Sequence, residues 1–276
     1  MLFSELWRPL TAVYDEHEAR AVARLVLEEH YGLSMADVLA GQMPDNAELA
    51  EIQQRLLTGE PVQYVLGWAE FCEQKFHVEP GVLIPRPETQ WMCDFVSNSW
   101  GFLPREGSIL DIGTGSGCIA CTIANDLSSQ PVEVVGWDIS ERALTVARDN
   151  AQRLGARVRF EKQDALCPPD DRERWDVIVS NPPYVCEQER ATMERNVLAF
   201  EPAEALFVPD DDPLLFYRSI GHYAIKALKP QSFLLVEINM RFGDSIGNLL
   251  LDTGFAKAKI FQDEFDKDRF VLAYKE

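Results

Sequence analysis

The sequence lacks any run of 18 or more apolar residues, and its start, MLFSELWRPL, has neither the basic region nor the continuous apolar stretch of a signal peptide. We therefore expect a cytoplasmic protein that does not associate with membranes. Basic residues are also scarce, with 26 Lys and Arg against 45 Asp and Glu, a formal net charge of −19. Because nucleic-acid binding depends largely on Lys and Arg at the phosphates, this balance argues against direct nucleic-acid binding.

Cysteine is sparse as well, with six residues scattered over 276 positions, which does not suit a disulfide framework. Cys118 and Cys121 form a C-x-x-C pair, but they lie in the small-residue apolar stretch GCIACTIA. No second cysteine pair or nearby histidine completes a zinc site. We predict that both cysteines are packed core residues and that the protein has no metal site.

What the sequence does contain is the material for a large core, since 46% of the residues are hydrophobic and 26% are charged. The length suggests one large or two modest domains. Residues 1–58 have only helical patterns, such as the apolar periodicity of residues 16–31 that stops at Gly32. Residues 59–88 carry several prolines and glycines around the β-like pieces WAEF and KFHV. We therefore predict a helical domain, a hairpin linker and a third domain over residues 89–276.

Strand and helix patterns alternate in this third region. A helical segment over residues 141–154 is one of those that separate the apolar strands. The predicted strands are residues 108–112, 132–138, 157–164, 175–181 and 232–238, followed by two late strands, 256–262 and 269–275, that can pair antiparallel at one edge. This order predicts an α/β fold with a mostly parallel sheet covered on both faces. Such sheets bind ligands at the carboxyl ends of their strands.

A glycine-rich turn follows the first of these strands. Its glycines allow a sharp turn and a close approach to a ligand at the start of the next helix. The turn consists of Gly113, Thr114, Gly115, Ser116 and Gly117. The spacing G-x-G-x-G differs from the dinucleotide fingerprint G-x-G-x-x-G, which makes nicotinamide binding less favoured. A loop that only closes the turn, or one that binds another nucleotide, remains an alternative.

Two carboxylates end the next two strands. Asp138, 21 residues after Gly117, is placed to accept hydrogen bonds from both ribose hydroxyls of a nucleoside, and a helix cap or a surface carboxylate is the alternative. Asp164 ends the third strand and can reach the exocyclic amine of an adenine. Carboxylates around a glycine loop suit a nucleoside that lacks phosphates and carries a positive centre. S-adenosylmethionine is such a molecule, and the pattern D-x-G-x-G-x-G resembles that of class I S-adenosylmethionine-dependent methyltransferases.

The fourth strand ends in the motif Asn181-Pro182-Pro183-Tyr184. Two prolines stiffen the exit from the sheet and withhold two N–H donors. A planar amine or amide has two N–H groups, which the side-chain carbonyl of Asn181 and the backbone carbonyl of Pro182 can accept. Tyr184 can cover one face of the planar group. We predict a methyl acceptor with a planar nitrogen, held in line with the sulfonium methyl, and the motif alone does not separate glutamine from adenine or guanine.

Several segments together resemble one family, the bacterial peptide chain release factor glutamine N5-methyltransferases. These segments are GEPVQYVLG (59–67), VLIPRPET (82–89), DIGTGSGCIA (111–120), VSNPPY (179–184), EPAEAL (201–206) and VEI (236–238). The resemblance implies a class I, Rossmann-like fold with a seven-stranded sheet, a helical domain over residues 1–58 that recognises a class I release factor, and methylation of the glutamine in its Gly-Gly-Gln motif. It implies further that residues 113–117, Asp138 and Asn181 hold S-adenosylmethionine and that residues 181–184 hold the glutamine. Ala165 falls near a position where family members can place an aromatic residue over the adenine.

Two other functions fit parts of the sequence. Nucleic-acid amino methyltransferases that modify adenine N6 or guanine N2 share the (D/N)-P-P-Y motif, but the charge of −19 opposes that substrate. A non-catalytic protein that binds S-adenosylmethionine would not need an acceptor clamp, yet Asn181 and both prolines are present. We therefore expect a release factor methyltransferase.

Overall fold

The computed structural model describes residues 2–44, 47–102, 106–263 and 265–276. The chain divides into two compact units. The helical unit comprises Met1–Trp68, Val78–Pro80 and Met193–Glu201, and the sheet unit comprises Ala69–His77, Gly81–Thr192 and Pro202–Glu276. The helical unit thus reaches ten residues beyond the predicted boundary at residue 58 and takes in a late segment that we had assigned to the third domain. The roles that we assign to the sequence-based domains stay a prediction.

The helical unit has the helices that the sequence predicts before residue 58. Helix α2 begins after Asp15, whose side chain accepts from the Glu18 amide, and it ends at Gly32, which has a φ of 67°. The core of the helical unit is formed by apolar side chains such as Leu6, Leu10, Leu27, Leu49 and Leu56. The helices are α1 (Phe3–Leu10), α2 (Glu16–Tyr31), α3 (Met35–Leu39), α4 (Ala47–Leu57), α5 (Val62–Leu66) and α9 (Arg195–Phe200).

The predicted hairpin linker contains one helix that the sequence analysis did not predict. Strands β1 (Trp68–Phe71) and β2 (Gln74–His77) form the two-stranded sheet, as expected from WAEF and KFHV. Helix α5 precedes them, because Pro61 can start a helix and Gly67, with a φ of 79°, ends it after one turn and a half. A segment this short gives too little periodicity to distinguish a helix from a strand.

The sheet unit is built on a seven-stranded sheet, which confirms the predicted fold class. The strands lie in the order β10-β11-β9-β6-β3-β4-β5. Within this sheet β11 pairs antiparallel with both neighbours, and the other pairings are parallel. The strands are β3 (Gly107–Ile112), β4 (Val132–Asp138), β5 (Val158–Lys162), β6 (Trp175–Ser180), β9 (Leu228–Glu237), β10 (Lys257–Gln262) and β11 (Asp268–Tyr274). The late strands β10 and β11 pair antiparallel at one edge, as predicted.

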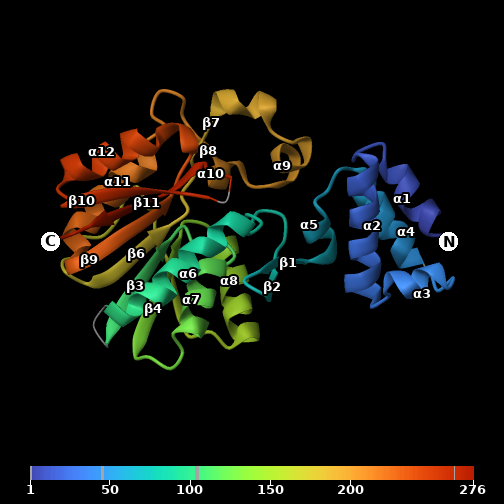
Figure 1. The fold of residues 1–276 in the computed structure, drawn as a ribbon, viewed down its shortest axis with the longest axis horizontal. Coiled ribbons are helices and arrows are strands. Elements are labelled where there is room, and N and C mark those ends of the chain that lie inside the picture. The colour runs from blue at the N-terminus through green and yellow to red at the C-terminus, as the bar shows by residue number, and fades with distance from the viewer. Residues whose placement is uncertain (1, 45–46, 103–105, 264) are drawn as a thin grey trace. The chain divides into compact units, whose positions relative to one another are not determined.

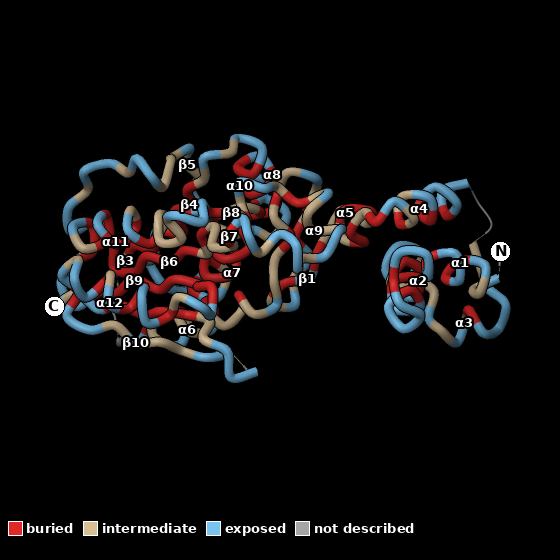
Figure 2. The backbone as a smooth tube through the Cα atoms, turned by 90° about the horizontal axis from the view of Figure 1, so that it is seen from above, coloured by how far each residue is buried: buried red, intermediate tan, exposed pale blue. Residues whose placement is uncertain are grey.

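Helices cover both faces of this sheet (Figure 1). Alternate residues of β3 show how the faces divide: Ile109 packs with α6 and α7, whereas Leu110 packs with α11 and α12. The strands β3, β6 and β9 are buried over most of their length (Figure 2), which explains why their sequences read as nearly continuous apolar runs. The covering helices are α6 (Gln90–Ser99), α7 (Cys118–Asp126) and α8 (Glu141–Leu154) on one face, and α11 (Leu215–Ala227) and α12 (Gly243–Thr253) on the other.

Short elements complete the described chain. They are α10 (Ala203–Leu206), β7 (Val185–Cys186), β8 (Phe207–Val208) and the 3₁₀ helices η1 (Pro87–Thr89), η2 (Trp100–Phe102), η3 (Glu187–Thr192) and η4 (Met240–Phe242). None of the helices in the described ranges combines the length and apolar composition that crossing a bilayer requires. Cys118 and Cys121 are buried in the core around α7, and burial raises the pKa of the Cys118 thiol to about 12. The prediction that they are packed core residues is confirmed.

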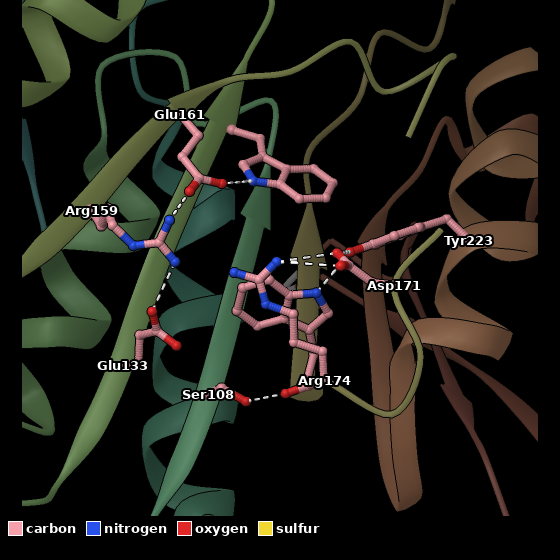
Figure 3. Close-up of polar contacts among 9 residues, drawn as sticks. Ser108, Glu133, Arg159, Glu161, Asp171, Arg174 and Tyr223 are labelled. Carbon is pink, nitrogen blue, oxygen red and sulfur yellow. Dashed lines mark hydrogen bonds and ion pairs between the residues drawn. The ribbon is translucent and has the colours of Figure 1, made fainter. Parts of the chain in front are cut away.

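Two buried tryptophans have their indole N–H groups satisfied by polar side chains (Figure 3). Trp175 of β6 donates to the hydroxyl of Tyr223 at 2.7 Å, and Tyr223 in turn donates to Asp171 at 2.8 Å. Trp137 of β4 donates to Glu161 at 3.0 Å. These hydrogen bonds let both indole side chains be buried with their N–H groups paired. An unpaired buried N–H group would destabilise the fold by about 1–3 kcal/mol.

Candidate active site

The glycine loop lies between β3 and α7, where the sequence predicts a ligand-binding turn. Gly113, Gly115 and Gly117 all have positive φ angles, of 78°, 56° and 80°. The amides of Gly113 and Thr114 both donate to the carbonyl of Trp137, at 2.9 and 2.8 Å, which fixes the loop against the end of β4. A side chain at Gly115 would meet no atom within 4 Å, so this part of the loop is open. A residue with a Cβ would be strained at these angles.

Gly117 lies where α7 packs closely against α8. It caps the N-terminus of α7, and a Cβ there would lie 3.0 Å from the Cβ of Ala147 in α8. That distance is shorter than ordinary van der Waals contact, so glycine lets α7 and α8 approach. Gly117 is not among the residues that line the cavity described below. Its predicted role in holding the cofactor stays a prediction.

Asp138 ends β4 and already binds two backbone amides. Its Oδ2 accepts from Gly115 at 2.9 Å and its Oδ1 accepts from Ser140 at 2.8 Å. Burial raises the pKa of Asp138, and its hydrogen bonds to backbone amides oppose that rise. A carboxylate has about four lone-pair sites, so these two bonds leave capacity for ligand hydroxyls.

Asp111, the acid of the D-x-G-x-G-x-G pattern, is fully buried beneath the loop. Its Oδ2 accepts from the Thr114 hydroxyl at 2.6 Å, while its Oδ1 has no hydrogen-bond partner in the described part of the chain. Burial raises its pKa to about 7. Asp111 does not line the cavity, so it acts on the shape and charge of the loop from below.

A cavity of about 280 Å³ opens at the carboxyl ends of the strands, within the sheet unit. It contains ten of the twelve predicted site residues: Gly113, Thr114, Gly115, Ser116, Asp138, Asp164, Ala165, Asn181, Pro182 and Pro183. The glycine loop and the acceptor motif are direct neighbours there, because a Cβ at Gly113 would lie 3.9 Å from the backbone oxygen of Asn181. The hydroxyl of Ser180 also donates to the carbonyl of Ile112 at 2.7 Å and joins the two strand ends.

Asn181 and Pro182 present acceptors at this cavity. The side-chain Nδ2 of Asn181 donates to the hydroxyl oxygen of Thr89 at 3.3 Å. Among the residues that the structure describes, no donor bonds to Oδ1 of Asn181 or to the carbonyl of Pro182. These two oxygens are the ones that the sequence analysis assigns to a planar nitrogen.

Tyr184 is bonded through its hydroxyl and its carbonyl to residues at and just after the end of β9. Its hydroxyl donates to Glu237 at 3.0 Å, and its carbonyl accepts from Asn239 at 3.2 Å. Burial beside Glu237 raises the pKa of this phenol. Tyr184 is not among the cavity-lining residues, so stacking on a substrate stays a prediction.

The cavity also contains residues that the sequence analysis did not assign to the site. Arg86 and Thr89 come from the IPRPET segment and Glu204 comes from EPAEAL. The apolar side chains that sequence reasoning missed include Ile139, Leu166 and Phe216. Ile139 could have been found, because an apolar residue directly after a strand-ending carboxylate has no place in the core, and it is indeed 57% exposed.

The residues around this cavity suit S-adenosylmethionine. Asp138 and Asp164 offer carboxylates for ribose hydroxyls and an amine, while Ile139, Leu166 and Phe216 offer apolar surface for a base. Among the described lining residues, Arg86 is the one cation, which is little for the phosphates of a nucleotide.

Comparisons with known proteins agree with this geometry. A family model described as a methyltransferase domain matches residues 104–241, and one described as the PrmC N-terminal domain matches residues 8–67. A crystal structure of a methyltransferase from Pyrococcus furiosus is similar in fold, with a TM-score of 0.52 and 17% identity over 82% of this chain and 98% of that chain. Fold and site together define a class I S-adenosylmethionine-dependent methyltransferase.

The curated relatives narrow this class. A release factor glutamine methyltransferase of Bacteroides thetaiotaomicron is 40% identical over 270 residues, 96% of this chain and 95% of that protein. One of Neisseria gonorrhoeae is 39% identical over 275 residues, 99% of this chain and 97% of that protein. The chain belongs to the release factor glutamine methyltransferase family.

Proposed function

We propose that this protein methylates the side-chain amide nitrogen, N5, of the glutamine in the Gly-Gly-Gln motif of class I peptide chain release factors, in the cytoplasm. One observation supports the proposal above others: Oδ1 of Asn181 and the carbonyl of Pro182 stand open beside the glycine loop. A primary amide has two N–H groups that fit two such acceptors. The curated relatives named above carry the same substrate in their names.

Within this proposal S-adenosylmethionine supplies an electrophilic methyl group on a sulfonium. The protein positions the acceptor amide. Asn181 and Pro182 would accept hydrogen bonds from its two N–H groups, so that the nitrogen lone pair is aimed at the sulfonium methyl. An amide is a poor nucleophile, and placement within about 3–3.5 Å of its target can contribute several kcal/mol to the barrier reduction. Oxygen acceptors at the N–H groups also stabilise the positive charge that develops on nitrogen.

The residues that we propose for the cofactor are those of the loop and of the strand ends around it. The open backbone at Gly113, Thr114, Gly115 and Ser116 would lie along the ligand, and Asp138 would accept from its ribose hydroxyls while still holding the Gly115 amide. Asp164 would reach the adenine amine, although its Oδ1 also accepts from the Leu166 amide at 2.8 Å. Ala165 cannot stack on the base, but the neighbouring Ile139, Leu166 and Phe216 supply apolar surface.

The release factor itself is the proposed partner, with no direct nucleic-acid or membrane contact. A net charge of −19 would attract a basic, RNA-facing protein surface and repel nucleic acid. We assign release factor recognition to the helical unit, because the cofactor cavity uses the sheet unit alone. Binding at a distance from the reacting glutamine can position a flexible glycine-rich loop that makes few contacts of its own.

The proposal is tested by incubating the protein with folded release factor and S-adenosylmethionine that carries a labelled methyl group. Digestion and mass spectrometry should place the label on the glutamine of Gly-Gly-Gln. A release factor with that glutamine replaced by alanine is the matched control and should stay unlabelled. Duplex DNA and RNA serve as competing substrates. The proposal is overturned if the glutamine carries no methyl group, or if a nucleic acid is methylated at a comparable rate.

A further inference from the structure

Glu237 is a carboxyl group buried at the end of β9, with 1% of its surface exposed. Two hydroxyl groups bind it: Thr89 Oγ1 lies 2.6 Å from Oε2, and the Tyr184 phenol lies 3.0 Å from Oε1. An ionised carboxylate accepts hydrogen bonds and donates none. The hydroxyl proton of Thr89 therefore points at Glu237.

Because the Thr89 hydroxyl donates to Glu237, its oxygen is restricted in the hydrogen bond that it makes with a second partner. A threonine hydroxyl has a single proton, and once that proton is given to Glu237 the oxygen can only accept. Its other neighbour is the side-chain amide of Asn181, with Nδ2 at 3.3 Å from Oγ1. Only the NH₂ end of the amide can satisfy an acceptor. Asn181 thus has one favourable orientation of the two that an amide can take, with Oδ1 turned away from Thr89.

We propose that Thr89 and Glu237 are positioning residues that hold Oδ1 of Asn181 available for the N–H group of the methyl acceptor. The inference rests on the function proposed above, in which Asn181 grips an amide. With the amide of Asn181 reversed, its NH₂ group would face the substrate N–H, and two donors cannot bond to each other. The relay from Glu237 through Thr89 therefore selects the productive form of Asn181.

The burial of Glu237 supports a role beyond packing. Placing a carboxylate in a protein interior is unfavourable unless its oxygens are bonded, and well-packed apolar side chains would often stabilise the fold as well or better. Unlike an apolar side chain, an ionised carboxylate accepts hydrogen bonds and never donates them. The three side chains come from three separate parts of the chain, η1, the end of β6 and the end of β9. Thr89 and Asn181 line the cavity, and Glu237 binds Thr89 from outside the cavity lining.

Replacement of Thr89 by valine or serine separates the hydroxyl from the shape of the side chain. Thr89→Val keeps the volume and removes the acceptor, and we expect kcat with release factor to fall by roughly ten- to a hundredfold, the range for a buried donor left unpaired. Thr89→Ser keeps the hydroxyl and should stay within about threefold of the wild-type kcat. Affinity for S-adenosylmethionine should change little in both variants. Equal turnover of the valine variant and the wild type overturns the relay, and so does a serine variant as slow as the valine variant.

Tyr217→Phe is the matched control for a general disturbance of Glu237. The Tyr217 hydroxyl is buried and donates to the backbone carbonyl of Glu237 at 3.0 Å, but it takes no part in the contact with Thr89. This variant should lose thermal stability to an extent similar to Thr89→Val and yet keep wild-type kcat. If Tyr217→Phe and Thr89→Val lose turnover equally, disturbance of Glu237 in general explains the effect and the proposal falls.

A spectroscopic measurement tests the relay without methyl transfer. In protein labelled with ¹⁵N at asparagine, the Asn181 side-chain NH₂ signal can be assigned by its loss in Asn181→Ala. We expect slow solvent exchange and a distinct shift for this group in the wild type and in Thr89→Ser, and fast exchange in Thr89→Val. An identical Asn181 signal in all three proteins overturns the relay. Absence of release factor methylation by the wild type would instead overturn the proposed function, so the two failures are distinguishable.

Discussion

The backbone amide of Gly115 donates to Oδ2 of Asp138 at 2.9 Å. The carboxylate that the sequence analysis assigns to ribose hydroxyls therefore also fixes the glycine loop, and its second oxygen holds the Ser140 amide at the start of α8. The conformation of the glycine loop therefore depends on the carboxylate of Asp138. A change at Asp138 will consequently alter both the direct contacts to a cofactor and the shape of the loop around it.

Asp138→Ala should weaken S-adenosylmethionine binding by about tenfold to a hundredfold, because two charge-assisted hydrogen bonds are worth about 1.5 kcal/mol or more each and water replaces part of them. Calorimetric titration of the wild type and the variant measures this difference. Asp149→Ala is the matched control, since Asp149 is an exposed carboxylate of α8 whose one ion pair within the described ranges is with Arg153 at 3.7 Å. A dissociation constant unchanged by Asp138→Ala would remove Asp138 from the site.

Asn181→Ala should leave the protein folded and lower kcat by roughly 10²–10³, the loss found for one preorganised polar group at a reacting centre. The side chain lies at the cavity surface and makes one hydrogen bond among the residues that the structure describes, so its loss disturbs little else. Transfer of a labelled methyl group to release factor is the measurement, with thermal unfolding as the check of folding. Asn98→Ala, at an exposed position of α6, should behave as the wild type. Wild-type kcat in Asn181→Ala would rule out the clamp.

The buried carboxyl of Asp111 predicts a pH-dependent stability of the cofactor-free protein. Its pKa of about 7 lies above the ordinary value of 3.8, so the folded chain keeps a proton that the unfolded chain releases. Unfolding therefore becomes more favourable as the pH rises from about 4 to 7, by up to roughly 4 kcal/mol for about three pKa units. Asp111→Asn, which cannot ionise and can still accept from Thr114, should lack this contribution.

The measurement for Asp111 is urea unfolding of both proteins at a series of pH values between 4 and 8. The free energy of unfolding of the wild type should fall relative to that of Asp111→Asn as the pH rises, and the variant should be the more stable protein at pH 8. Glu237, whose pKa burial also raises, changes stability in the same direction in both proteins and cancels in the difference. The charge of Asp138 contributes to the raised pKa of Asp111, so the interaction between these two carboxyls is part of the difference that is measured. Parallel pH profiles for the two proteins would refute the prediction.

The charge of −19 predicts that methylation of release factor depends on salt. Association between oppositely charged surfaces is steered over distances of about 10 Å at 0.1 M salt and is screened above that concentration. The value of kcat/KM for whole release factor should therefore fall as salt is added. A short, uncharged Gly-Gly-Gln peptide is the control: it should be a far poorer substrate and respond little to salt. Equal salt dependence for the peptide and the whole factor would contradict steering by charge.

The parts of this fold that follow local patterns could be predicted from the sequence. Strand β4 was expected over residues 132–138 and lies there, because its buried face and its terminal carboxylate are both visible within seven residues. The glycine loop and Asn181 lie at neighbouring strand ends, since β3 and β6 pair in parallel and parallel strands bring their carboxyl ends to one edge of the sheet. Helix α5 was missed, because five residues do not show a helical period.

The contacts around Asn181 could not be predicted, because they join distant positions in the sequence. Thr89 lies 92 positions before Asn181 and 148 before Glu237. No periodicity links such positions; only the strand order, with β9 next to β6, brings the end of β9 beside the acceptor motif. The turn of Tyr184 toward Glu237 has the same origin, since the sequence shows an aromatic residue but not the buried carboxyl that binds its hydroxyl.

The membership of α9 in the helical unit has a consequence for the newly synthesised chain. Burial and the nearby charge of Glu194, at the start of α9, raise the pKa of Glu18 in α2. Yet Glu201 lies 133 positions after Trp68 in the chain. At about 5–20 residues per second, a ribosome needs roughly 7 to 27 s to add these residues. During that interval the amino-terminal helices have been synthesised and the segment that completes their unit has not. A nascent chain stalled after residue 192 should therefore be cut by protease within residues 1–68 more readily than one stalled well beyond residue 201.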